Sequence, residues 1–325
     1  MEYSFEPRQG DVKGAFSPEF APVLEVELGH TITLKNLPDA GWGRWWELEE
    51  DRRNEVRQFW PKQPEKENGQ AVVGPITLHK VQKGDWIEIR VEKINPASYG
   101  FTAAAGWDSP TNRAMGPDIT APAAHIFHAW AIDPATHTAT DQFGRKLKLA
   151  PFLGTLGLCH GNAPWYAATP PYPTGGNLDC PLLTEGSCLY VRAAIPGGGL
   201  YVGDAHGRQG FGEVSGTALE IPLQELQLHI RKPASQPPEI DNCFLKTKDQ
   251  QWVCFGFHPE LNVAAETATR ELVDLMANLY HLPRTNCLLY ASLLADLKIC
   301  QIVNGTRAVA ASFDPAALAL PPTAL

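Results

Sequence analysis

The sequence predicts a mainly β protein, built from antiparallel β-sandwich-like sheets with a small helical element near the C-terminus. Three observations favour this fold class. The 325 residues include 28 glycines and 28 prolines, so turns must be frequent. Short segments of alternating apolar and polar residues recur in the first half and again in the middle of the chain, as expected of half-buried strands. A helical period of apolar residues appears only near the C-terminus.

The first strands are expected over residues 23–28 and 31–34, with Gly29-His30 between them as a hairpin turn. A second pair is expected over 74–81 and 86–94, around the turn Lys83-Gly84-Asp85. The charged stretch 47–68 is expected to form a solvated excursion or a short irregular helix. From 101 to 155, repeated prolines favour long loops with a few short strands.

The second half shows stronger patterns. Strands over 187–194, 200–206 and 213–223, separated by glycine-rich turns, predict an antiparallel meander. Helical spacing predicts a helix over 264–280 that Pro283 ends, followed by a short helix over 286–294 and a strand over 299–303. The length favours one large domain or two closely packed subdomains. Residues 1–150 would form an N-terminal β-rich subdomain, and residues 151–325 the catalytic one.

Composition excludes several function classes. The net charge of −9 and the pI near 5.6 would repel phosphate backbones and anionic lipid, so neither nucleic acid nor membrane is an expected partner. No secretory signal and no run of about 18 apolar residues is present, and a cytoplasmic location is expected. Seven cysteines without a C-x-x-C pair indicate reduced thiols rather than a disulfide framework or a zinc ribbon.

The stretch 203–213 concentrates polar residues where an antiparallel hairpin must turn. Side chains two apart on a strand share a face, so Asp204 and His206 are expected to point together. A turn over 207–212 would then place Glu213 opposite His206. Carboxylate oxygen with imidazole nitrogen suits zinc or a similar divalent ion. The alternative interpretation is that all three are polar turn and edge residues satisfied by solvent, which is common.

A second turn, Gly175-Gly176-Asn177-Leu178-Asp179, is by itself an ordinary Asx-type turn. It is, however, one of six motifs that follow the order seen in the acetamidase/formamidase family, which the chain resembles. The motifs lie at 151–157, 175–179, 184–190, 203–206, 209–210, and 212–214 with 217–220. The likeness extends to residues 22–24, 74–76 and 292–303, and it is weakest from Gly100 to Asp141.

The resemblance implies a β-rich hydrolase that releases ammonia from small linear amides such as formamide or acetamide, often as a homodimer, with a divalent metal ion at the site. Zinc is the expected ion and calcium the alternative. By position, Asp204, His206 and Glu213 correspond to metal ligands, and Glu213, Asp179 and Asn177 to catalytic residues.

Three further positions bear on the resemblance. Gln209 is a weaker site candidate. Phe211 stands where the family commonly has an aspartate, and His160 stands where a proline is usual. Losing a carboxylate lowers the negative charge available to a cation, so metal affinity or substrate choice could differ from that of relatives.

The expected chemistry follows from the inertness of amides, whose nitrogen donates into the carbonyl group. A bound metal ion can polarise the carbonyl or lower the pKa of water to about 7. We expect hydroxide attack, with Glu213 or Asp179 moving the proton to the leaving nitrogen, and with Asn177 or a glycine N–H assisting at the oxyanion. Covalent routes are disfavoured, because no G-x-S-x-G motif is present and the neighbours Cys159 and His160 would face opposite sides of a strand.

Tryptophans at positions 42, 45, 46 and 60 favour a rival function, since exposed tryptophans can stack on sugars or line an apolar groove. Packing in a core or dimer interface is the preferred interpretation. A non-catalytic or divergent β-sandwich protein that binds a small ligand is therefore the alternative function, and Phe211 keeps it open.

Overall fold

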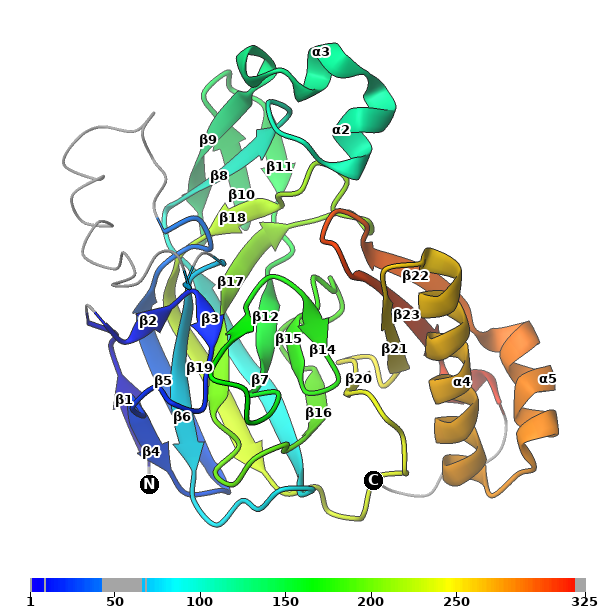
Figure 1. Cartoon of the computed structure of the whole chain (residues 1–325). Coiled ribbons are helices and arrows are strands. Elements are labelled where there is room, and N and C mark those ends of the chain that lie inside the picture. The colour runs from blue at the N-terminus through cyan, green and yellow to red at the C-terminus, as the bar shows by residue number, and fades with distance from the viewer. Residues whose placement is uncertain (1, 9, 43–65, 68, 319–325) are drawn as a thin grey trace.

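The computed structural model describes residues 2–8, 10–42, 66–67 and 69–318 (Figure 1). Within these residues the strands form a nine-stranded sheet, a twelve-stranded sheet and a small two-stranded sheet. Pairing is antiparallel except between β1 and β5 and between β4 and β6. The expectation of a mainly β fold with antiparallel sheets is confirmed.

The elements have the following bounds. The nine-stranded sheet runs β1 (Glu2–Phe5), β5 (His30–Leu37), β19 (Leu223–Arg231), β7 (Trp86–Pro96), β16 (Cys188–Arg192), β20 (Phe244–Lys246), β21 (Trp252–His258), β23 (Arg307–Phe313), β22 (Asp296–Gln301). The twelve-stranded sheet runs β11 (Lys146–Lys148), β10 (Thr138–Asp141), β9 (Ile126–Asp133), β8 (Tyr99–Ala104), β18 (Leu219–Ile221), β17 (Leu200–Arg208), β12 (Phe152–Leu158), β15 (Gly175–Asn177), β14 (Pro171–Tyr172), with β6 (Val72–Leu78) beside β17, and β2 (Val12–Lys13) and β4 (Leu24–Val26) beside β6. The third sheet pairs β3 (Ala15–Phe16) with β13 (Tyr166–Ala167), and the helices are α2 (Pro110–Met115), α3 (Pro117–Thr120), η1 (Pro122–Ala124), α4 (Leu261–Tyr280), α5 (Arg284–Leu294), η2 (Pro315–Ala317).

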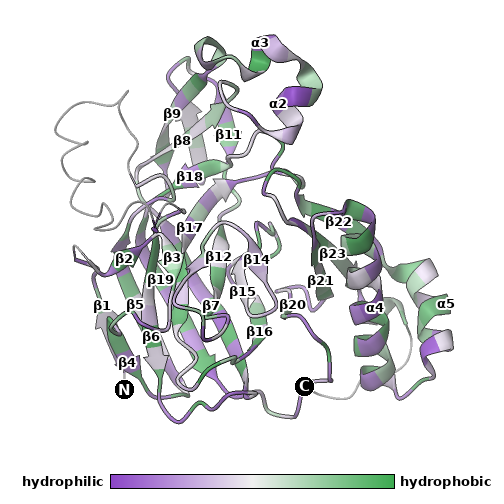
Figure 2. Cartoon of the chain, viewed as in Figure 1, coloured by the Kyte–Doolittle hydropathy of each residue, from purple (hydrophilic) through white to green (hydrophobic). Residues whose placement is uncertain are grey.

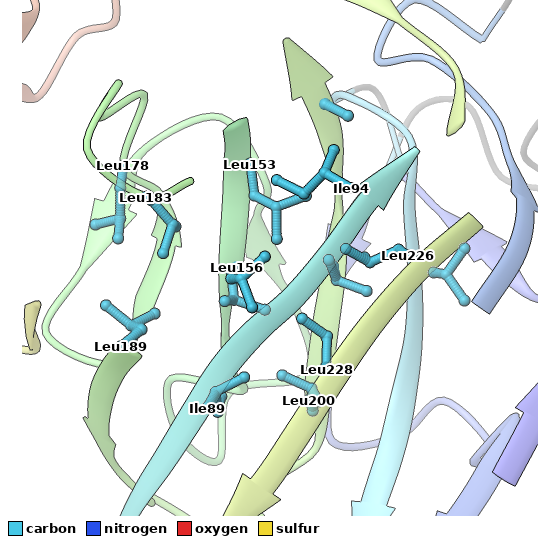
Figure 3. Packing of buried hydrophobic residues seen from close by; sticks show 14 of the residues in the cluster. Ile89, Ile94, Leu153, Leu156, Leu178, Leu183, Leu189, Leu200, Leu226 and Leu228 are labelled. Atoms are coloured by element: carbon cyan, nitrogen blue, oxygen red, sulfur yellow. The ribbon is translucent and has the colours of Figure 1, made fainter. Parts of the chain in front are cut away.

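The main core lies between the two large sheets (Figure 3). Leu153 and Leu156 of β12 pack there with Ile89 of β7 and with Leu226 and Leu228 of β19, and all five are fully buried. Each such side chain contributes roughly 1.5–3 kcal/mol to folding by leaving water. Of these five residues, only Ile89 lies in a strand predicted from the sequence, because β12 and β19 were not among the predicted strands.

A second core lies under the C-terminal helices. Helix α4 covers β21 and β23 and runs beside α5 (Figure 1), and both polar and apolar residues occur along it (Figure 2). Its buried residues, including Leu272 and Met276, pack on Phe244 and Trp252. The predicted helix is confirmed, and it ends at Tyr280, before a left-handed residue. The predicted second helix and final strand are also present, as α5 and β22.

The predicted strands exist, and β17 pairs with β18 as the meander predicts, but the predicted hairpins around Gly29 and Gly84 and the pairing of β16 with β17 are wrong. β4 lies in the twelve-stranded sheet, whereas β5, which follows Gly29, lies in the nine-stranded sheet. β6 and β7, around Gly84, are separated in the same way, as are β16 and β17 of the expected meander. Alternation shows that one face of a strand is buried. Because both sheets bury a face on the same core, alternation cannot say which sheet a strand joins.

The stretch from 101 to 155 contains more regular structure than predicted. β8, β9, β10 and β11 form an antiparallel unit that carries α2 and α3, at the top of Figure 1. Both large sheets combine strands from before and after residue 150, and the proposed boundary there stays a prediction. Trp45, Trp46, Trp60 and most of the charged stretch 47–68 lie outside the described residues. No helix in the described part of the chain is long and apolar enough to cross a membrane.

Candidate active site

Strand β17 carries two residues of the predicted site in the middle of the twelve-stranded sheet. The Nε2 atom of His206 lies 3.0 Å from Oδ1 of Asp204, and both side chains are buried. Their neighbour is β12, where Phe152 pairs with His206 and its ring meets the imidazole edge to face. The structure thus brings these two side chains together, as their two-residue spacing predicts.

Gly154 of β12 makes room for this pair. A Cβ atom at Gly154 would lie 2.8 Å from Oδ2 of Asp204 and 2.8 Å from Cε1 of His206. Both distances are shorter than the non-bonded contacts that Cβ atoms make in folded proteins. The carbonyl oxygen of Gly154 also accepts hydrogen bonds from the backbone N–H groups of Leu178 and Asp179. One glycine therefore helps to position both halves of the site.

The residue opposite His206 is Glu220 of β18, not Glu213. The connection between β17 and β18 is longer than the predicted turn at 207–212, so the predicted pairing of His206 with Glu213 is wrong. Oε2 of Glu220 lies 3.3 Å from Nε2 of His206. Glu220 was not among the site residues predicted from the sequence. The available signal was a single carboxylate between Leu219 and Ile221 in an otherwise apolar strand.

Glu213 reaches the cluster from the connecting loop and meets Asp179 there. The two carboxyl groups share a hydrogen bond. Two sets of possible ligand atoms result, each within 4.8 Å of one another: Asp179, His206 and Glu213 in one, and Asp204, His206 and Glu220 in the other. The predicted triad of Asp204, His206 and Glu213 is thus divided between two sets that share the imidazole.

Three of these acids have a left-handed backbone. The φ angles are 46° at Asp179, 54° at Asp204 and 44° at Glu213. Residues other than glycine seldom adopt this conformation, which costs on the order of 1–3 kcal/mol and is concentrated at functional sites. The sheet and its loops therefore hold the carboxylates in positions that local backbone preference alone would not select.

Asn177 is fully engaged within the protein. Its Nδ2 donates to the backbone oxygen of Thr169 and to Oδ2 of Asp179, at 2.9 Å each, and its Oδ1 accepts a hydrogen bond from Thr155. An amide with these partners orients Asp179 and has no N–H left for an oxyanion. The expected oxyanion role of Asn177 is not supported by this geometry.

Two more amides hold Asp179. Asn304, between β22 and β23, donates to Oδ2 of Asp179 at 3.2 Å. No motif pointed to Asn304, which lies 125 residues further along the chain. The Nε2 group of Gln209 donates to the backbone oxygens of Asp179 and Cys300. Gln209 therefore ties the Asp179 turn to β22 and is not among the residues that line the cavity.

The cluster forms part of the wall of a cavity of about 540 Å³. Its polar wall contains Asn177, Asp179, Asp204, Glu213, Glu220 and Asn304. His206 is buried and is not among the residues that line the cavity. The lining also includes the aromatic residues Trp42, Phe101, Trp107, His125 and Phe127, and Phe101 of β8 is the strand partner of Glu220. Trp42 is buried and donates its indole N–H to the backbone oxygen of Gly69, in agreement with a packing role.

Burial and mutual repulsion perturb the acids. Burial raises the pKa of Glu213 to about 8; His206 opposes this rise, and Glu220 and Asp204 add to it. Burial, then Glu213 and Asp204, hold the pKa of Asp179 well above its usual range. Burial lowers the pKa of His206, but the carboxylates of Glu220 and Asp204 outweigh burial and raise it well above 6.5.

The donor set fits a divalent cation. Four buried carboxyl groups surround one imidazole, and no lysine or arginine is among the described residues that line the cavity. Nδ1 of His206 has no hydrogen-bond partner in the described part of the chain, and Oε2 of Glu220 has only the imidazole of His206, 3.3 Å away, beside it. Buried negative charge without compensation is costly. A cation bound by carboxylate oxygen and imidazole nitrogen would remove that cost.

The two departures from the family pattern lie away from the cluster. Phe211 is 40% exposed, and Nζ of Lys298 lies 5.9 Å from its ring centroid. His160 stacks on Tyr172, with ring centroids 4.8 Å apart. Neither residue lines the cavity. Cys159 is a buried thiol whose pKa is raised by burial, as expected of a packed, unreactive cysteine.

Together, the sandwich fold and a buried cluster of acids and one histidine beside a cavity define a class: mainly β proteins with a site suited to a divalent metal. Residues 165–311 match the model of the Acetamidase/Formamidase family, and this stretch contains all four carboxylates and His206. The resemblance seen in the sequence motifs is confirmed.

Solved structures share the fold over nearly the whole chain. A predicted acetamidase/formamidase from the thermophile Thermoanaerobacter tengcongensis has 21% identity and a TM-score of 0.81, with 98% of this chain and 97% of that chain covered. An acetamidase from Yersinia enterocolitica has 22% identity and a TM-score of 0.80 (98% and 93% covered). An acetamidase from Bacillus halodurans has 21% identity and a TM-score of 0.78 (96% and 97% covered). Among the curated proteins, none matches this chain.

Proposed function

We propose that this protein hydrolyses the C–N bond of linear carboxamides to a carboxylate and ammonia. The observation that carries the proposal is the ring of four buried carboxyl groups around His206 on the wall of a cavity. The family match supports an amidohydrolase that acts on linear amides. The acetamidases that share the fold support small amides such as formamide and acetamide as substrates.

Asp204, His206 and Glu220 are the residues that would hold a divalent metal ion. Oxygen and nitrogen donors together favour zinc, and calcium is the alternative because oxygen donors predominate. When bound, the ion would supply Lewis-acid chemistry, by polarising the amide carbonyl or lowering the pKa of water. Glu220 thus takes the ligand position that sequence analysis gave to Glu213.

Asp179 and Glu213 form the acid–base pair. Because burial raises the pKa of Glu213 to about 8, this carboxyl group can both accept and release a proton close to neutral pH, and the pKa of its partner Asp179 is raised as well. As the water oxygen bonds to the carbonyl carbon, the pair takes up the proton of the water. It then gives a proton to the nitrogen as the C–N bond breaks and ammonia leaves. Asn177 and Asn304 keep Asp179 in place for this transfer.

The matched variants Glu220→Gln and Glu213→Gln test this division of roles. Each keeps the shape of the side chain and removes one carboxylate. Glu220→Gln should lose bound metal, measured by elemental analysis, together with ammonia release. Glu213→Gln should retain metal but release ammonia about 100-fold more slowly or worse. Glu266→Gln, at an exposed position of α4, is the control.

Metal loss in Glu213→Gln with metal retained in Glu220→Gln would restore the ligand set predicted from sequence. Wild-type activity in both variants would refute the catalytic proposal.

We also propose that the protein is a cytoplasmic homodimer. The family resemblance supports the dimer, and the seven free thiols support a reducing compartment. Light scattering at several protein concentrations would test the dimer, since a monomer mass throughout would contradict it.

A further inference from the structure

The wall of the cavity beside the acidic cluster is aromatic, because Phe101 of β8 is the strand partner of Glu220. Phe101 of β8 and Phe127 of β9 stack with ring centroids 5.5 Å apart and ring planes 11° apart. Trp107, which follows β8, packs beside His125, with ring centroids 6.0 Å apart. All four side chains line the cavity. They come from the part of the chain that departs most from the family pattern.

The structure fixes this wall in place. The Nδ2 group of Asn112 in α2 donates to the backbone oxygen of Trp107 at 2.9 Å, and Ser109 caps the same helix. A Cβ atom at Gly216 would lie 3.6 Å from the indole of Trp107, so this indole packs against the loop backbone. The N–H of Gly216 donates to the backbone oxygen of Glu213. The aromatic wall is therefore connected directly to the loop that supplies a catalytic carboxyl group.

The cavity is larger than the smallest amides require. A water molecule occupies about 30 Å³ of liquid, so acetamide, with four non-hydrogen atoms, needs roughly 100 Å³. The cavity has about 540 Å³, within the range of about 300–1,000 Å³ of pockets that enclose drug-sized ligands. A site for formamide or acetamide alone would leave most of this volume filled with water against aromatic rings.

We propose that the preferred substrate is a primary carboxamide that bears an aromatic ring and no negative charge, of the phenylacetamide class. The ring would lie against Phe101, Phe127 and Trp107, where offset or edge-to-face contacts stabilise aromatic pairs. The carboxamide then lies at the acidic wall. A substrate carboxylate is disfavoured, because the described lining residues include four acids and no lysine or arginine. This inference rests on the proposed amide hydrolysis and names the substrate class for that same site.

The test compares acetamide, phenylacetamide and 4-carboxyphenylacetamide by ammonia release from the full chain with zinc added. For phenylacetamide, kcat/KM should exceed the acetamide value at least about tenfold, because an apolar group in a fitted pocket is worth a factor of 10 or more. The carboxylate derivative should fall back by about tenfold or more.

Phe127→Ala should lower kcat/KM for phenylacetamide about tenfold more than it lowers kcat/KM for acetamide. Phe143→Ala is the matched control, since Phe143 lies in the turn between β10 and β11, is 63% exposed and does not line the cavity. Equal kcat/KM for the two neutral amides would overturn the inference, as would an equal loss on both substrates in Phe127→Ala.

Calorimetric binding of phenylacetamide separates this inference from the proposed reaction. Binding that is lost in Phe127→Ala, without ammonia release from any amide, would overturn hydrolysis and retain the aromatic subsite. Ammonia release from acetamide, without measurable binding of phenylacetamide, would overturn the subsite and retain hydrolysis.

Discussion

Gly154→Ala offers a direct test of how the site is built. The added methyl group would lie 2.7 Å from the backbone oxygen of Asp204, 2.8 Å from its Oδ2 atom and 2.8 Å from Cε1 of His206. Two of these atoms belong to side chains that the proposed ligand set needs at a fixed separation. The backbone oxygen belongs to a paired strand and cannot easily retreat, so the imidazole and carboxylate must move apart.

The substitution Gly154→Ala should lower both the stability of the protein and its activity. Overpacking of this kind typically costs about 1–3 kcal/mol, so the variant should still fold, with a melting temperature a few degrees lower. Moving groups that hold or orient a metal ion typically costs about 10–100-fold in affinity or activity. We therefore expect ammonia release to fall at least tenfold while the circular dichroism spectrum stays that of the wild type.

Gly210→Ala is the matched control, because a Cβ atom there has no neighbour within 4 Å. Gly210 lies on the connection between β17 and β18, whereas Gly154 lies in β12, and the Gly210→Ala variant should retain both stability and activity. Metal content, melting temperature and ammonia release would be measured on both variants. Wild-type metal content and turnover in Gly154→Ala would refute the argument that the close approach of β12 sets the ligand geometry.

Three further predictions concern charge. In protein treated with a chelator, Glu213 keeps its proton to about pH 8 in the folded state and releases it near pH 4.5 in the unfolded state. The free energy of unfolding should therefore fall as pH rises from 5 to 8. A rise in this free energy, measured by urea denaturation, would contradict the prediction. Removing metal with a chelator at pH 8 should lower the melting temperature, and added zinc should restore it in proportion to the logarithm of the free zinc concentration. A melting temperature that responds to neither chelator nor zinc would argue against a cation among the four acids. Glu271→Ala should destabilise the protein by about 1–3 kcal/mol without changing kcat, because Glu271 is fully buried and accepts hydrogen bonds from the backbone N–H groups of Asp241 and Asn242. Glu266→Ala is the exposed control. Equal stability of the two variants would count against this role of Glu271.

Local patterns in the sequence determine the fold class and part of the site. Alternation predicts strands such as β5, β7 and β17, and helical spacing predicts α4, because both signals depend on residues only a few positions apart. Asp204 and His206 were identified for the same reason. Their chemistry and their two-residue spacing are properties of one strand.

Only the tertiary structure determined which strands and side chains lie next to one another. Sheet membership separates β4 from β5 and β6 from β7, because packing on the common core outweighs closeness in sequence. The register of β17 with β18 selects Glu220 as the neighbour of His206, and a loop far along the chain supplies Asn304. The aromatic wall likewise depends on how the β8–β11 unit sits over the cavity. Each of these contacts joins distant segments, and their energy depends on the packing of the whole sandwich, which no local pattern of residues encodes.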